Sequence, residues 1–138
     1  MQNGSGPPRV LVVDDEPQVV WMLQLALTAE GFATVAAHDG MEALAQLERH
    51  NPHVLVLDLM MPRMDGWSVL AALAEVSPAR RPRIVMLSAL SSEAEQRRAL
   101  EAGADAFVTK PFDMDDLITL LHRFSPAGRV GPRRPLSA

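Results

Sequence analysis

Five short runs of apolar, largely β-branched residues recur along the 138-residue chain, and they limit its possible folds more than any other feature. Each run is continuous rather than alternating, which is typical of strands buried on both faces of a parallel sheet. The runs are Val10–Val13, Ala33–Ala36, Val54–Leu57, Ile84–Leu87 and Ala106–Thr109. We therefore expect a five-stranded sheet with a covered core on each side.

Segments with helical spacing separate the runs and follow the last one. Pro17 suits the first turn of a helix, and Gly31 suits the position just past a helix end. The predicted helices are Pro17–Ala29, one that starts at Asp39 and ends before Asn51, one from Trp67 to about Glu75, one opened by Ser92 and closed by Gly103, and one from Asp113 to about Phe124. Strands alternating with helices predict the α/β class, here a (βα)5 doubly wound parallel sheet with right-handed crossovers.

The length is that of one domain, which we expect to span residues 9–124. Residues 1–8 are predicted to be a flexible lead-in, and the Pro-, Gly- and Arg-rich residues 125–138 a flexible tail or truncated linker. The tail has three arginines and no acid, so residues 1–124 carry 10 basic and 17 acidic side chains, a net charge of −7. An acidic domain is not expected to bind nucleic acid directly.

Two absences restrict the class of protein further. The chain has no cysteine, which excludes a disulfide framework and Cys-ligated zinc and fits a cytoplasmic location. No apolar run approaches the roughly 20 residues needed to span a bilayer, so no membrane association is expected.

Chemically functional side chains follow four of the five runs. The carboxyl ends of parallel strands share one edge of the sheet, where ligands bind in folds of this kind. The side chains are Asp14, Asp15 and Glu16 after the first run, Asp58 after the third, Ser88 after the fourth and Lys110 after the fifth. The second run ends in Ala36-Ala37-His38, which fits an outer strand away from the site.

This set of side chains suits phosphoryl transfer to a carboxylate. Asp14, Asp15 and Asp58 would repel one another, and Mg2+, which prefers oxygen ligands, would remove the conflict. Lys110 is the single lysine beside twelve arginines, and its compact ammonium could contact Asp58 or a phosphoryl oxygen. Asp58 could then act as the nucleophile that forms an acyl phosphate, while Ser88 offers a hydroxyl donor.

With these residues, the chain resembles a receiver domain of a two-component response regulator. The resemblance rests on "VVDDEP", "LVLDLMMPRMDG", "MLSA" and "VTKPF", in order and at compatible spacing over residues 9–124. It implies a flavodoxin-like fold with strand order 2-1-3-4-5 and a phosphoryl group accepted by Asp58 from a sensor histidine kinase or phosphotransfer protein. The chain would not be an enzyme in the usual sense, because it would catalyse only its own phosphoryl transfer and slow autodephosphorylation.

The resemblance also implies a role for individual residues. Asp15, Asp58 and the backbone carbonyl of Met60 would bind Mg2+ directly, with Asp14 acting through water. Lys110 would pair with Asp58 and then with the phosphoryl group. Ser88 would move toward the phosphoryl group. Phe107 would occupy the family's aromatic switch position and fill the space that Ser88 leaves.

Phosphorylation would then change one surface of the domain. That surface comprises the helix opened by Ser92, the strand Ala106–Thr109 and the helix after Asp113. It would control a partner or an output domain, and a homodimer through it is a further option. The Lys110–Pro111 bond should be cis, and Asp65-Gly66 fits the sharp turn of the site loop, where the permissive backbone of glycine is useful.

Some residues depart from the family pattern. The switch aromatic is Phe107 rather than Tyr, so its ring has no hydroxyl to donate. Met60 and Leu90, expected to flank the site, cannot orient a hydrolytic water, so we expect a long-lived phosphoryl-Asp58.

Three other functions are alternatives to a phosphoacceptor receiver domain. An aspartyl-phosphate phosphatase needs a second acid at the place of Met60, and nucleotide binding lacks its glycine-rich motif. The third is a degenerate receiver that serves only for docking, and the complete set of site residues argues against it.

Overall fold

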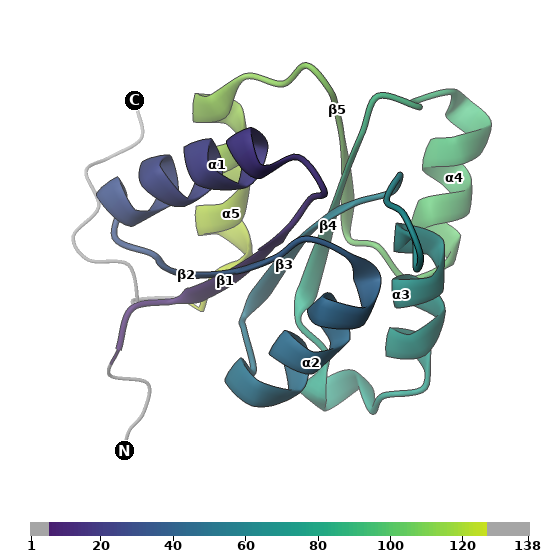
Figure 1. The fold of residues 1–138 in the computed structure, drawn as a ribbon, viewed down its shortest axis with the longest axis horizontal. Helices are drawn as coiled ribbons and strands as arrows, with labels where there is room; N and C mark the ends of the chain where they lie inside the picture. Colours follow the sequence, from purple (N-terminus) through teal and green to yellow (C-terminus); the bar gives the residue numbers. More distant parts are fainter. Residues whose placement is uncertain (1–5, 127–138) are drawn as a thin grey trace.

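A computed structural model describes residues 6–126 as one parallel five-stranded sheet in the order β2-β1-β3-β4-β5, with helices on both faces (Figure 1). This is the predicted flavodoxin-like fold. The elements are β1 (Arg9–Val13), α1 (Pro17–Ala29), β2 (Ala33–Ala37), α2 (Gly40–His50), β3 (Val54–Asp58), α3 (Gly66–Ala74), the 3-10 turn η1 (Pro78–Arg80), β4 (Arg83–Ser88), α4 (Glu93–Glu101), β5 (Ala106–Thr109) and α5 (Met114–Phe124).

Each face of the sheet has its own hydrophobic core. Leu11 and Leu55 contribute to the core beneath α2, α3 and α4, whereas Val10 and Val54 contribute to the core beneath α1 and α5. Neighbouring residues of a strand point to opposite faces. Because both faces are covered, the residues inside a central strand are apolar on both sides, which explains why the runs are continuous rather than alternating.

The helix starts and ends follow the predicted local signals. The Asp39 side chain caps α2 by accepting a hydrogen bond from the Glu42 amide at 2.8 Å, and Ser92 and Asp113 cap α4 and α5 in the same way. Gly31, just past α1, has a φ of +98°, which suits glycine. The observed ends differ from the predicted ones by one residue or so, and η1 was not predicted.

The predicted flexible segments fall mostly on residues 1–5 and 127–138, which lie outside the described residues. Pro8 is buried, and its carbonyl accepts a hydrogen bond from the Ala33 amide at 2.9 Å. At the other end, the Ser125 hydroxyl donates to the Leu121 carbonyl at 2.7 Å. Among residues 6–126, no helix is both long and apolar enough to cross a membrane.

The central strand β3 should dominate the stability of the domain. Leu55 is fully buried, so Leu55→Ala should lower the free energy of unfolding by about 2–5 kcal/mol through lost burial and a residual cavity. Urea denaturation measures this difference. Leu25 on α1 is 59% exposed and serves as the control, with an expected change below about 0.5 kcal/mol for Leu25→Ala. Equal effects of the two variants would contradict the placement of the core.

Candidate functional site

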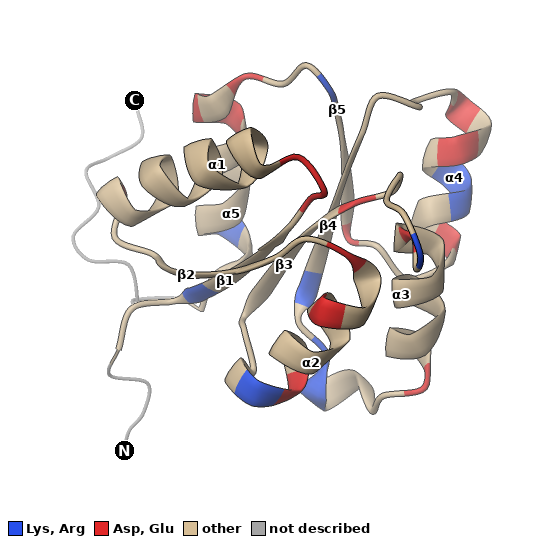
Figure 2. Ribbon diagram, in the orientation of Figure 1, with Lys and Arg blue, Asp and Glu red and all other residues tan. Residues whose placement is uncertain are grey.

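The strand order brings the predicted site residues to one edge of the sheet. Asp14 directly follows β1, Asp58 ends β3, Ser88 ends β4 and Lys110 directly follows β5. These four strands are consecutive neighbours, and β2, which supplies no such side chain, is an outer strand, as predicted. Acidic segments mark this edge in Figure 2, in the loop after β1 and at the end of β3.

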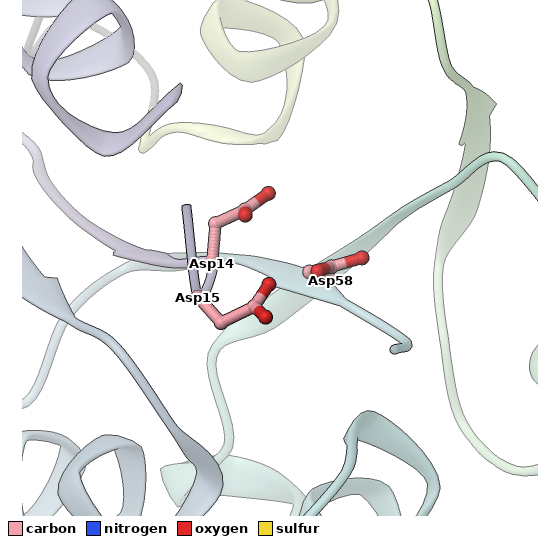
Figure 3. A group of neighbouring side chains, drawn as sticks. All are labelled: Asp14, Asp15 and Asp58. Atoms are coloured by element: carbon pink, nitrogen blue, oxygen red, sulfur yellow. The ribbon is translucent and has the colours of Figure 1, made fainter. Parts of the chain in front are cut away.

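Three carboxylates meet at the carboxyl ends of β1 and β3. Asp14, Asp15 and Asp58 each place one oxygen within 4.8 Å of the other two, and Figure 3 shows their side chains extending into a common space. Asp14 is 1% exposed and Asp58 3% exposed, whereas Asp15 is open to solvent. The edge of the site is therefore accessible although its centre is buried.

Lys110 is the cation nearest to these acids. Its Nζ donates to Asp14 Oδ2 at 2.8 Å and lies 3.6 Å from Asp58 Oδ1 and 4.0 Å from Glu16 Oε1. The ion pair with Asp58 is present, but the hydrogen bond goes to Asp14. Burial lowers the pKa of Lys110, but the hydrogen bond to Asp14 and the neighbouring carboxylates outweigh it, so the pKa lies above its ordinary value.

The ionised form of Asp58 is destabilised by its surroundings in the site. Burial, followed by repulsion from Asp14, raises its pKa to about 6, although Lys110 and the Met60 amide favour the charged form. The hydrogen bond from that amide to Asp58 Oδ1 is long, at 3.4 Å. The Asp58 carboxyl is therefore mostly ionised at neutral pH, but its ionised form is less stable than that of a solvent-exposed carboxyl.

The donor set fits a hard divalent cation. Asp14, Asp15 and Asp58 offer only oxygen ligands, which Mg2+ prefers. Three carboxylates face one ammonium, so the cluster has an excess of about two negative charges when all are ionised. A divalent cation would balance this excess, and the open position of Asp15 gives it access from solvent.

Gly66 supports the loop after Asp58 in a way that the sequence did not reveal. Its φ is not in the left-handed region, so the expected reason for glycine was wrong. A Cβ at this position would lie 2.6 Å from the Asp58 carbonyl oxygen and 2.8 Å from Leu59 Cα. Glycine is needed because the start of α3 packs directly against the backbone of the central carboxylate. The Lys110–Pro111 bond is cis, as expected.

A second contact holds the same loop and was missed in the sequence. The Arg63 guanidinium donates to Asp39 Oδ2 at 2.6 Å, and the Gly40 amide donates to the Met64 carbonyl at 3.1 Å. A Cβ on Gly40 would overlap the Met64 backbone. The only sequence signal is that Asp39-Gly40 repeats the Asp-Gly pair that opens α3.

The two predicted switch residues lie on neighbouring strands. Ser88 is fully buried, and its Oγ accepts a hydrogen bond from the Leu90 amide at 3.0 Å. In the parallel register Phe107 lies beside Met86 and packs partly buried against the core under α2, α3 and α4. The Ser88 Oγ therefore has a local donor, and its own hydroxyl hydrogen stays available for an acceptor.

Comparison with known proteins identifies relatives over nearly the whole described chain. The family model described as "Response regulator receiver domain" matches residues 10–122. The transcriptional regulatory protein TrcR of Mycobacterium tuberculosis is 41% identical over 119 residues, which is 86% of this chain but 45% of TrcR. The chain therefore spans about half the length of the curated relatives that it matches.

Solved structures agree with this match. The chain is similar to the receiver domain of the Francisella response regulator 1452, with a TM-score of 0.79 and 35% identity over 85% of this chain and 95% of that one. It is also similar to the chemotaxis response regulator CheY4 of Vibrio cholerae, with a TM-score of 0.79 and 30% identity over 86% and 98% of the two chains.

The raised pKa of Asp58 predicts an unusual dependence of stability on pH. The folded protein binds the Asp58 proton more tightly than the unfolded chain, so this group's contribution to stability is lost as the pH rises from about 4 to about 6. In metal-free buffer at pH 7.5, Asp58→Asn should raise the free energy of unfolding by about 1–2 kcal/mol. The gain should shrink toward pH 4.

Urea denaturation at both pH values measures this difference. Glu48→Gln on the exposed side of α2 is the control and should not change the pH dependence. If Asp58→Asn were less stable than the unmodified chain at pH 7.5, this would contradict the inferred destabilisation of the Asp58 carboxylate by burial and by Asp14.

Proposed function

Because the chain belongs to the receiver-domain family of response regulators, we propose that it is a phosphoacceptor switch with Asp58 as the acceptor. The donor is a phosphorylated histidine of a sensor kinase or phosphotransfer protein. One observation supports this most directly: a buried carboxylate ends the central strand, with two further carboxylates and the only lysine of the chain around it.

The proposed transfer is a displacement at phosphorus. An Asp58 carboxylate oxygen forms the new P–O bond while the P–N bond to the donor histidine breaks, and its electron pair stays on the imidazole nitrogen. Asp58 is suited to this because its pKa of about 6 leaves it ionised at neutral pH while burial keeps it poorly solvated. Asp14 and Asp15 are the side chains that would hold Mg2+ with Asp58, and the ion would supply positive charge against the phosphoryl oxygens.

Lys110 and Ser88 are proposed to contact the transferred group. The Lys110 ammonium already lies 3.6 Å from Asp58 Oδ1, so a small movement away from Asp14 brings it to a phosphoryl oxygen. The Ser88 hydroxyl accepts from the Leu90 amide, which leaves its own hydrogen free to donate to a second phosphoryl oxygen. Both contacts follow the charge that phosphorylation adds.

The conformational response is proposed to start at Ser88. Its movement leaves space beside β4 that the partly buried ring of Phe107 on β5 can fill, and this changes the surface formed by α4, β5 and α5. Phosphorylation would then bias a two-state equilibrium rather than create a new fold. Since longer relatives are named as transcriptional regulators, we propose that this surface controls an output domain or a separate partner.

Phosphorylation of Asp58 can be tested with acetyl phosphate and Mg2+. Intact mass should increase by one phosphoryl group, and Asp58→Asn should abolish the increase because no other site residue is placed as the nucleophile. Asp115→Asn, which removes an exposed carboxylate from the start of α5, is the control and should be phosphorylated like the unmodified chain. An equal mass increase in the Asp58→Asn variant would refute the assignment.

The lifetime of the phosphoryl group should be long. Met60 and Leu90 are apolar and 57% and 45% exposed, so they offer no group that orients a water for attack on phosphorus. After removal of the phosphodonor, intact mass should show decay over minutes or longer, and Met60→Asn should accelerate it. Met41→Asn, at an exposed methionine of α2, should leave the rate unchanged. Loss within seconds in the unmodified chain would contradict this prediction.

A further inference from the structure

The amino-terminal end of the sheet, opposite Asp58, has a groove of about 640 Å3 whose charged lining is entirely basic. Four arginines line it, and no acidic residue does among the described residues. They are Arg80 of η1, Arg81, Arg83 of β4 and Arg123 of α5. Figure 2 shows basic segments at the start of β4 and at the end of α5, away from the acidic loop after β1.

Most of this positive charge has no acidic partner. Arg83 pairs with Asp105 at 3.2 Å, and its guanidinium stacks on the Phe124 ring at 4.4 Å. The Arg81 Nε donates to a backbone carbonyl, which leaves its charge uncompensated. Within residues 6–126, no carboxylate lies at ion-pair distance from Arg80, Arg81 or Arg123.

The described lining of the groove does not supply the missing anion. Phe124, Ser125 and Pro126 line the groove, and residues 127–138 that follow them contain three arginines and no acid. Three guanidinium groups that line one groove without a described carboxylate partner, in a protein of net charge −4, point to an external anion.

We propose that this groove binds a small ligand with two or more linked phosphate groups. Arginine is the side chain best suited to phosphate, because its planar guanidinium donates two parallel hydrogen bonds. Several guanidinium groups in one groove match several phosphates rather than one. A long nucleic acid is disfavoured, because residues 1–124 carry a net charge of −7 and would repel a polyanion beyond the groove. The site does not depend on the proposed phosphorylation of Asp58.

Isothermal titration calorimetry of the whole chain with tripolyphosphate tests this proposal. The buffer is metal-free and of low ionic strength, so that a metal at the acidic site cannot recruit the phosphates. Saturable binding is expected, and the double variant Arg80→Gln/Arg123→Gln should weaken it at least about tenfold, because it removes two charge-assisted contacts to phosphate. Arg97→Gln, at an exposed arginine of α4 outside the groove, is the matched control and should bind as the unmodified chain does.

Two further ligands separate the sources of the phosphates. ATP that binds more tightly than tripolyphosphate would identify a nucleoside polyphosphate, and ATP of equal or lower affinity would identify an inorganic polyphosphate. Both results support the site.

Four results would overturn the proposal. They are an absence of binding, an equal loss in Arg97→Gln, hexaglutamate that binds as tightly as tripolyphosphate, and a DNA duplex that binds more tightly than either phosphate compound. The thermal unfolding midpoint of each variant should match that of the unmodified chain, which confirms that the exposed substitutions leave the fold intact.

Discussion

The crowding of carboxylates around Asp58 is the constraint on which the rest of the site depends. Asp58 ends the central strand of a fully covered sheet, so it is desolvated by the same packing that stabilises the fold. Asp14 adds repulsion, and the pKa of Asp58 rises to about 6 as a result. One ammonium, from Lys110, cannot balance three acids. The site therefore has an excess of negative charge that a divalent cation would balance, with the three carboxylates as its ligands.

The loop after Asp58 is fixed by contacts with the starts of two helices. The start of α3 approaches the Asp58 backbone so closely that only glycine fits at position 66. The start of α2 binds the same loop through Asp39 and Gly40, which contact Arg63 and Met64. Two helix starts therefore fix one short segment from different sides. Such support would keep the Asp58 oxygens in place, which the proposed phosphoryl transfer requires.

Local patterns in the sequence were sufficient for the (βα)5 parallel class and for the common edge of the acids, whereas the strand order was implied by the resemblance to receiver domains. Continuous apolar runs indicate doubly covered strands, and parallel strands place their following residues at a common edge. The sequence did not reveal what depends on relative placement. The need for glycine at position 66 arises from a clash across the turn, and the closer contact of Lys110 with Asp14 arises from side-chain geometry. Neither has a periodic signal.

The charges of the domain are divided between the two ends of the sheet, and part of this division has a structural cause. In a βα fold the helices begin at the carboxyl ends of the strands and end at the amino ends. Acids near helix starts and bases near helix ends are therefore favoured by the helix dipole. Arg123, in the last turn of α5, is explained in this way. Arg80 and Arg81 are not, since they belong to no α-helix and have no carboxylate partner among residues 6–126. The part of the basic groove that the dipole leaves unexplained is the part that indicates an anionic ligand.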